Sequence, residues 1–261
     1  MRPASAKGDT LASQNAEASV PSSGAWRAEL AAAIRDVAGL RRALDLPPDP
    51  AASRAEQSFP VLVPPAYLAR IRRGDPHDPL LRQVLPIAAE MVAVPGYGPD
   101  PVSEQGCQAV PGLLRKYQGR ALLVTTAACA VHCRYCFRRS FPYHAVPRGR
   151  AWWQPAAAAV AADPSLDELI LSGGDPLTLP DATLAALVAD VAAPRHIKRL
   201  RIHTRLPVMI PSRIDPSCLA WLMACGKEVV VVIHANHPNE IDAEVAAACR
   251  RLQGAGFLVF N

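Results

Sequence analysis

Three thiols fall within the eight residues Cys129-Ala130-Val131-His132-Cys133-Arg134-Tyr135-Cys136, in the spacing C-x3-C-x2-C. An apolar run at 121–126 precedes this loop and predicts a buried strand. Thiolates packed this closely favour a soft metal centre. A [4Fe–4S] cluster has one more iron than this loop has thiols, so one iron would stay open to a substrate or cosubstrate.

Two other interpretations of the loop stay open. A structural zinc ion would need a fourth ligand, which His132 or His144 could supply. A disulfide-exchange site would need only Cys133 and Cys136. The position of the loop directly after a predicted strand favours the iron–sulfur interpretation.

The totals favour a cytoplasmic globular protein. The chain has 261 residues, of which 50% are hydrophobic and 20% charged, enough for one large domain or two small ones. Seven cysteines, three of them in one loop, do not form the disulfide framework of a secreted protein. The formal charge of +5 permits anionic ligands without arguing for nucleic acid. No run approaches the ~20 apolar residues of a membrane span, and the N-terminus lacks a secretory signal. We therefore expect neither a membrane nor a nucleic-acid partner.

The chain divides into three predicted parts. Residues 1–24 are rich in Ala, Ser and Gly and predict a disordered tail. Residues 25–112 predict a helical region, with one helix from Trp26 to about Leu46, one or two short helices in 58–94, and a loop at 95–112. Residues 113–261 predict a core domain in which strands at 122–126, 168–171, 200–203, 228–233 and 256–260 alternate with helices at 155–162, 181–192, 215–225 and 240–253. This alternation indicates an α/β fold with a parallel sheet, right-handed crossovers and apolar strands buried on both faces.

Polar clusters follow the strands of this predicted sheet. They are the cysteine loop, Ser172-Gly173-Gly174-Asp175, His203-Thr204-Arg205 and His234-Ala235-Asn236-His237. Parallel α/β folds place their chemistry at the carboxyl ends of strands, so we expect these clusters to form one site. The chain stops at Asn261, directly after the fifth strand. Either the sheet is open, or a C-terminal part is lacking.

Each cluster also has a purely structural interpretation. Ser172–Asp175 fits a strand-to-helix turn in which Asp175 caps the helix. A histidine at a strand end is often structural. The basic residues Arg115, Lys116, Arg120, Arg138 and Arg139 could be a solvated face. Arg120 opens the first strand and Arg138 follows the last loop cysteine, so both could face an anionic ligand. Cys107, Cys218, Cys225 and Cys249 look inert.

Two levels of family resemblance follow from these motifs. The cysteine spacing, with the aromatic Tyr135 just before the last thiol, resembles the radical S-adenosylmethionine superfamily. Several further segments resemble the lysine 2,3-aminomutases, most closely the bacterial branch that makes (R)-β-lysine for elongation factor P. They are 78–84, 110–117, 133–139, 171–177, 197–203 and 236–240.

The resemblance implies a fold, a reaction and cofactors. The fold would be a partial TIM-like (β/α) radical S-adenosylmethionine barrel with an N-terminal helical extension. The reaction would convert (S)-α-lysine to (R)-β-lysine, with a [4Fe–4S] cluster, S-adenosylmethionine and pyridoxal 5′-phosphate. A flavodoxin or ferredoxin would donate the electron, and the product would pass to the elongation factor P lysine ligase.

The resemblance also implies roles for residues. The cluster would lie on Cys129, Cys133 and Cys136. Arg138 would bind the substrate carboxylate. Lys116, Tyr117 and Arg120 would hold the pyridoxal phosphate. Ser172, Gly173, Gly174 and Asp175 would bind the methionine amino group of S-adenosylmethionine. From their positions in the cysteine loop and at the strand ends, the further cofactor-binding candidates are Tyr135, His203, Arg205, His234 and Asn236.

The sequence departs from the family at several points. Asp175 replaces a glutamate of the superfamily motif, and Lys116 replaces an arginine of the classical aminomutases. The family's pyridoxal-binding lysine, and the acidic residues for the substrate ε-ammonium, belong beyond residue 261. We therefore expect that these 261 residues alone do not complete the isomerisation. The alternatives are a radical S-adenosylmethionine enzyme without pyridoxal phosphate, an inactive remnant, and a zinc-stabilised module whose basic loop at 134–139 binds RNA.

Overall fold

The fold is described by a computed structural model for residues 20–143 and 150–261. The tail predicted at 1–24 thus lies mostly outside the described residues. Its last residue, Gly24, donates its backbone N–H to the Asp215 carboxylate at 2.9 Å. No helix in the two described ranges is long and apolar enough to cross a membrane.

The N-terminal region contains short helices rather than one long one. They are α1 (Ala25–Ala31), α2 (Val37–Ala43), α3 (Pro50–Glu56), α4 (Pro65–Leu68) and the 3-10 turns η1 (Leu81–Gln83), η2 (Ala88–Met91) and η3 (Gln105–Cys107). The predicted single helix from Trp26 to Leu46 is wrong. Ile34 and Val63 exchange backbone hydrogen bonds of 2.9 Å in an isolated β-bridge, which interrupts the helix. Asp36 then caps α2 by accepting from Gly39 N–H at 2.6 Å.

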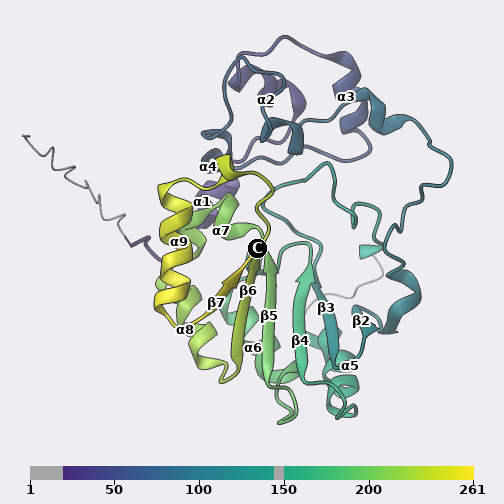
Figure 1. Ribbon diagram of the computed structural model, residues 1–261, viewed down its shortest axis with the longest axis vertical. Coiled ribbons are helices and arrows are strands. Elements are labelled where there is room, and N and C mark those ends of the chain that lie inside the picture. Colours follow the sequence, from purple (N-terminus) through teal and green to yellow (C-terminus); the bar gives the residue numbers. More distant parts are fainter. Residues whose placement is uncertain (1–19, 144–149) are drawn as a thin grey trace, which may run out of the picture.

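One seven-stranded sheet forms the centre of the chain (Figure 1). Its strands lie in chain order: β1 (Gln108–Val110), β2 (Leu113–Tyr117), β3 (Arg120–Thr126), β4 (Glu168–Gly173), β5 (Arg199–Thr204), β6 (Glu228–Ile233) and β7 (Leu258–Phe260). β3 to β7 are parallel, which confirms the five predicted strands. β1 and β2 pair antiparallel at one edge, although residues 108–110 were predicted to be loop.

The strand order resembles an arc of a barrel. A doubly wound sheet reverses its strand order at a switch point, and this sheet does not. Within the described residues β1 and β7 are free edges, so closure of the predicted barrel is not observed. The larger connecting helices are α5 (Arg150–Ala161), α6 (Asp181–Val191), α8 (Pro216–Ala224) and α9 (Ala243–Gly254); shorter turns are α7 (Leu206–Met209), η5 (Pro176–Thr178), η6 (Pro211–Arg213) and η7 (Pro238–Glu240). α5 packs on α6, and α6 on α8.

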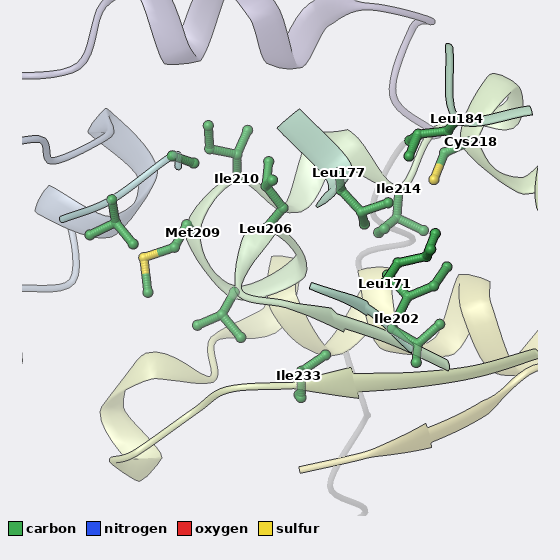
Figure 2. Packing of buried hydrophobic residues seen from close by; sticks show 14 of the residues in the cluster. Leu171, Leu177, Leu184, Ile202, Leu206, Met209, Ile210, Ile214, Cys218 and Ile233 are labelled. Atoms are coloured by element: carbon green, nitrogen blue, oxygen red, sulfur yellow. The ribbon is translucent and has the colours of Figure 1, made fainter. Parts of the chain in front are cut away.

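The main core lies between the sheet and these helices. Leu171 of β4, Ile202 of β5 and Ile233 of β6 belong to the same buried cluster as Leu206 and Met209 of α7, and Leu171 and Ile202 lie near Ile214 (Figure 2). β5 alternates strictly: Leu200 and Ile202 are fully buried, whereas its odd-numbered side chains remain partly exposed. The expectation of burial on both faces therefore fails for β5. Its second face carries Arg199, Arg201 and His203 and is available for a site.

The N-terminal region lies beyond the carboxyl ends of the strands. In Figure 1 the purple and blue segments with α2 and α3 lie above the arrowheads of β4, β5 and β6. Backbone hydrogen bonds tie this region to the cysteine loop, from His132 to Leu62 at 3.1 Å and from Arg134 to Gln83 at 2.8 Å. The N-terminal region thus contacts the cysteine loop at the carboxyl edge of the sheet.

Candidate active site

The cysteine loop leaves the carboxyl end of β3 and is held by apolar anchors. Ala130 and Val131 are buried, while the three thiols are free and partly exposed. His132, one candidate zinc ligand, stacks on Phe59 and its Nδ1 lies 2.9 Å from the Pro60 carbonyl oxygen. The other candidate, His144, lies outside the described residues.

The loop supplies the right donors for an iron–sulfur cluster. Burial raises the pKa of Cys129 well above its ordinary value and also raises the pKa of Cys136. These thiols therefore favour the protonated form until a metal binds. No three His, Cys, Asp or Glu side chains form a ready-made metal-binding group within residues 20–143 and 150–261. The loop thus fits the cluster by the type and number of its ligands. The three thiolates would have to move closer together when the cluster binds.

The two glycines at the end of β4, Gly173 and Gly174, allow the cysteine loop to approach the sheet. Gly174 donates its N–H to the Thr126 carbonyl at 2.6 Å, and Asp175 donates to Ala128 at 2.7 Å. A Cβ on Gly174 would lie 2.2 Å from the Ala128 oxygen. Gly173 has a φ of 117°, which disfavours other residues. The glycines therefore serve close backbone packing directly before Cys129.

Asp175 joins the ends of β4 and β5. Its Oδ1 accepts from Leu177 N–H at 3.1 Å and from the Thr204 hydroxyl at 2.7 Å. Its Oδ2 accepts from the N–H groups of Arg205 at 2.7 Å and Leu206 at 3.2 Å. Burial raises the pKa of this carboxyl, and these hydrogen bonds oppose the shift. The predicted capping role is thus observed, together with a second role at the end of β5.

Arg205 extends from the end of β5 into the cysteine loop. Its Nη1 lies 2.8 Å from Cys133 Sγ and 2.6 Å from the Tyr135 hydroxyl. Its Nη2 donates to Glu240 at 2.6 Å and to Gln83 at 3.1 Å. Burial opposes the charge, but Cys133, Tyr135 and Glu240 raise the pKa of Arg205 above its ordinary value. Arg205 therefore stays charged.

Arg138 is buried against an internal carboxylate. Its Nε and Nη2 donate to the two oxygens of Glu104 at 2.7 and 2.6 Å. Its Nη1 donates to the Ser172 hydroxyl at 2.8 Å. This two-point pair fixes the plane of the guanidinium. The structure thus joins Arg138 and Ser172, two residues that the sequence predicted separately.

A cavity of about 200 Å³ opens on the second face of the sheet near Arg138. Its lining brings together the predicted Lys116, Tyr117, Arg120 and His203, with Glu104 and Arg201 in addition. Lys116 also contacts the Val102 carbonyl, and its ammonium lies 5.9 Å from the Tyr117 ring. The three cationic side chains make the cavity suitable for an anionic group.

Two neutral histidines border this region. The rings of His203 and His234 lie 5.7 Å apart. Burial lowers the pKa of His203 to about 4, and burial also lowers the pKa of His234. His203 Nε2 is buried without a hydrogen-bond partner among the described residues. A buried polar atom of this kind ordinarily has a partner, so His203 Nε2 is a candidate contact for a group bound in the cavity.

A second, more open cavity adjoins the cysteine loop from the other side. It measures about 400 Å³ and is lined by Pro79, Arg82, Gln83, Tyr135, Asn236 and His237. Asn236 contacts the Tyr135 hydroxyl through its side-chain amide. The predicted Tyr135 and Asn236 therefore line the same cavity. Arg205 does not line it but contacts the Tyr135 hydroxyl.

Comparisons with known proteins identify relatives of this chain. No family model matches the chain. Over 244 residues it is 43% identical to an L-lysine 2,3-aminomutase of Escherichia coli strain K12, covering 92% of this chain and 71% of the relative. The enzyme of Haemophilus influenzae is 41% identical over 238 residues, covering 90% and 70%. That of Clostridium subterminale is 33% identical over 241 residues, covering 90% and 57%. The chain belongs to the lysine 2,3-aminomutase family.

Family membership confirms the resemblance and the enzyme class. The lysine 2,3-aminomutases are isomerases of the radical S-adenosylmethionine type, and relatives with this name match about nine-tenths of the chain. The family implies a [4Fe–4S] cluster and S-adenosylmethionine. The individual site residues stay predictions, now with defined neighbours.

Four further residues enter the aminomutase site that the sequence did not single out as ligands or partners. They are Gln83, Glu104, Arg201 and Glu240. Gln83, Arg201 and Glu240 lie within the resembling segments, and this was the one signal in the sequence that could have found them. Glu104 lies in a predicted loop, and Glu240 was taken as the first residue of a helix that begins at Ala243. Their roles depend on burial beside distant arginines, which no local pattern reveals.

Proposed function

We propose that this chain belongs to an enzyme that performs the radical isomerisation of (S)-α-lysine to (R)-β-lysine, and that its 261 residues supply the cluster and S-adenosylmethionine sites of that reaction. The observation that carries the proposal is the convergence of the C-x3-C-x2-C loop, the Ser172–Asp175 turn and the ends of β5 and β6 at one edge of the sheet. The chain's similarity to L-lysine 2,3-aminomutases supports the same reaction.

The cluster and S-adenosylmethionine would supply the radical, and pyridoxal phosphate would stabilise it beside the migrating amino group. Cys129, Cys133 and Cys136 would ligate the cluster. The carboxyl ends of β4, β5 and β6 would hold S-adenosylmethionine, and the residues already predicted there line that edge. Enclosure by the N-terminal region would exclude water and other hydrogen donors from the site.

The basic side chains would divide the anionic groups between them. Arg138 would bind the lysine carboxylate through its remaining N–H groups, with its plane fixed by Glu104. Lys116 and Arg120 would neutralise the phosphate of pyridoxal phosphate in the smaller cavity. His203 would present a neutral imidazole there, because its pKa is lowered to about 4.

The proposed partners rest on the family resemblance. An electron donor such as flavodoxin or ferredoxin would reduce the cluster. The product would serve the ligase that modifies elongation factor P, as in the bacterial branch that the sequence most resembles.

The cluster is tested by metal analysis. The chain and its Cys133→Ser variant are purified and reconstituted anaerobically, and iron, sulfide and zinc are measured with the electron paramagnetic resonance signal after dithionite reduction. The matched control is Cys225→Ser, at the end of α8. We expect iron and sulfide in the wild type and control, and a loss of most iron in Cys133→Ser. Zinc without iron would support the binding-module alternative instead.

Pyridoxal phosphate is tested by titration followed through its absorbance. Arg120→Gln should weaken binding about tenfold, the effect of one lost charge-assisted contact. The control is Arg115→Gln, because Arg115 pairs with Asp163 and does not line the cavity. Equal affinities in both variants would favour a radical S-adenosylmethionine enzyme that does not use pyridoxal phosphate.

A further inference from the structure

Arg205 uses its complete set of hydrogen-bond donors inside the protein. A guanidinium has five N–H groups. Here Nε donates to the His234 carbonyl, Nη1 to Cys133 Sγ and the Tyr135 hydroxyl, and Nη2 to Gln83 and Glu240. Within the described part of the chain it therefore has no N–H left for S-adenosylmethionine. Its contact with the Cys133 thiol therefore points to a role other than binding the cosubstrate.

Glu240 fixes the direction of this guanidinium. The carboxylate is fully buried, and its Oε1 accepts from the backbone N–H groups of Asn236 at 2.8 Å and His237 at 3.0 Å. The same oxygen accepts from the Gln83 side chain at 2.8 Å. The other oxygen, Oε2, is thereby directed at Arg205, 2.6 Å away. A buried carboxylate held by backbone amides is a rigid acceptor.

Gln83 completes the arrangement from the N-terminal region. Because its Nε2 donates to Glu240, its Oε1 faces the opposite way and accepts from Arg205 at 3.1 Å. Arg205 is thus held by a residue 122 positions before it and one 35 positions after it. The remaining donor edge, at Nη1, faces Cys133 and Tyr135. This places the positive end of an N–H group on the sulfur of a proposed cluster ligand.

We propose that Arg205 is a positioning residue that holds the Cys133 sulfur and raises the reduction potential of the cluster, with Glu240 and Gln83 holding Arg205 in place. This inference rests on the proposed function, since it requires the cluster. An N–H donor to a ligand sulfur stabilises the added negative charge of the reduced cluster. The cluster takes up one electron from the reductant more readily when this bond is present.

Charge-conserving variants separate the hydrogen bond from the net charge of the site. Arg205→Lys keeps the positive charge but loses the planar fork that reaches four acceptors besides the His234 carbonyl. Glu240→Asp keeps the negative charge but shortens the side chain, so that the carboxylate no longer reaches Arg205. Gln83→Met removes a neutral acceptor at similar volume. The matched control is Arg213→Lys, because Arg213 is another buried arginine with a carboxylate partner, Asp181.

The experiment uses the anaerobically reconstituted full chain. Iron per chain and thermal unfolding are measured first, and dithionite reduction is then followed by electron paramagnetic resonance at controlled potentials. In Arg205→Lys and Glu240→Asp we expect the ratio of reduced to oxidised cluster at a fixed potential to fall at least tenfold. For a one-electron couple this is a midpoint decrease of about 59 mV. Gln83→Met should shift the midpoint in the same direction by less, and Arg213→Lys should not shift it.

The outcomes are distinct. A folded Arg205→Lys protein that loads less iron than Arg213→Lys also supports the positioning role. If Arg205→Lys does not fold, the midpoints of Glu240→Asp and Gln83→Met decide the question. An unchanged midpoint in the loaded variants, or an equal shift in Arg213→Lys, overturns this inference and leaves the proposed function intact. A wild-type chain that binds no iron and sulfide overturns both.

Discussion

Gly174→Ala should loosen the join between the cysteine loop and the sheet. The added Cβ would lie 2.2 Å from the Ala128 oxygen and 2.8 Å from the carbonyl carbons of Ala127 and Ala128. All three are backbone atoms, so no side chain can rotate away. The φ of Gly174 is not positive, so alanine itself is not strained there. The cost therefore comes from displacing residues 127–128, directly before Cys129.

The magnitude follows from the bonds at this join. Relief of the clash separates the hydrogen bonds from Gly174 to Thr126 and from Asp175 to Ala128, of 2.6 and 2.7 Å. Each contributes about 1 kcal/mol. Overpacking adds about 1–3 kcal/mol, and the lower chain entropy of unfolded alanine returns less than about 1 kcal/mol. We expect the free energy of unfolding to fall by about 3 kcal/mol.

Equilibrium unfolding in urea measures this change, and Gly98→Ala is the matched control. No heavy atom lies within 4 Å of a Cβ at Gly98, and its φ is not positive. Its free energy of unfolding should change by less than about 1 kcal/mol. Iron content after anaerobic reconstitution should fall in Gly174→Ala only. A Gly174→Ala protein as stable as the Gly98→Ala protein would refute the role assigned to the glycine.

Three further results are expected. Burial lowers the pKa of His203 from 6.5 to about 4, so the unfolded chain binds the proton at a higher pH than the folded chain does. The free energy of unfolding should therefore fall as the pH decreases from about 6.5 to 4, by up to about 3 kcal/mol. Urea unfolding across this range checks it, and His203→Asn should flatten the profile. Ile202→Ala, in the core of Figure 2, should cost about 2–5 kcal/mol by the same assay, whereas Ile87→Ala at an exposed site should cost little. A double-mutant cycle of Arg138→Lys with Glu104→Gln should give a coupling free energy of about 1–3 kcal/mol, and additive effects would contradict their two-point pair.

The parallel part of the fold was predictable from the sequence because its signals are local. Apolar runs of strand length recur between helical stretches, and the structure confirms all five parallel strands with small shifts of their ends. The N-terminal region was harder. Leu30, Ile34, Val37, Leu40 and Leu44 keep helical spacing across a real interruption. The pairing of Ile34 with Val63 is a tertiary contact, and it outweighs that periodicity.

The candidate site was predictable where motif and strand end coincide. The cysteine loop, Ser172–Asp175 and Arg205 all lie at the expected edge of the sheet, because parallel strands bring their carboxyl ends together. Glu104 could not be found this way. It lies 34 residues from Arg138, in a segment without periodicity, and only burial of both charges reveals the pair. A family resemblance assigns roles to the residues that match its motifs, but it does not identify residues such as Glu104 that hold those side chains in place.

The cysteine loop is held at two places, at its start by the end of β4 and at its middle by Arg205 from the end of β5. Gly174 and Asp175 fix the start of the loop through backbone contacts with residues 126 and 128. Arg205 fixes its middle at Cys133. Asp175 also accepts from the N–H of Arg205, so the two supports are linked at the end of β5. A substitution in either support should disturb the other. The spacing of the cysteines is set by the sequence of one loop, whereas their exact placement depends on strands β3 to β6 together.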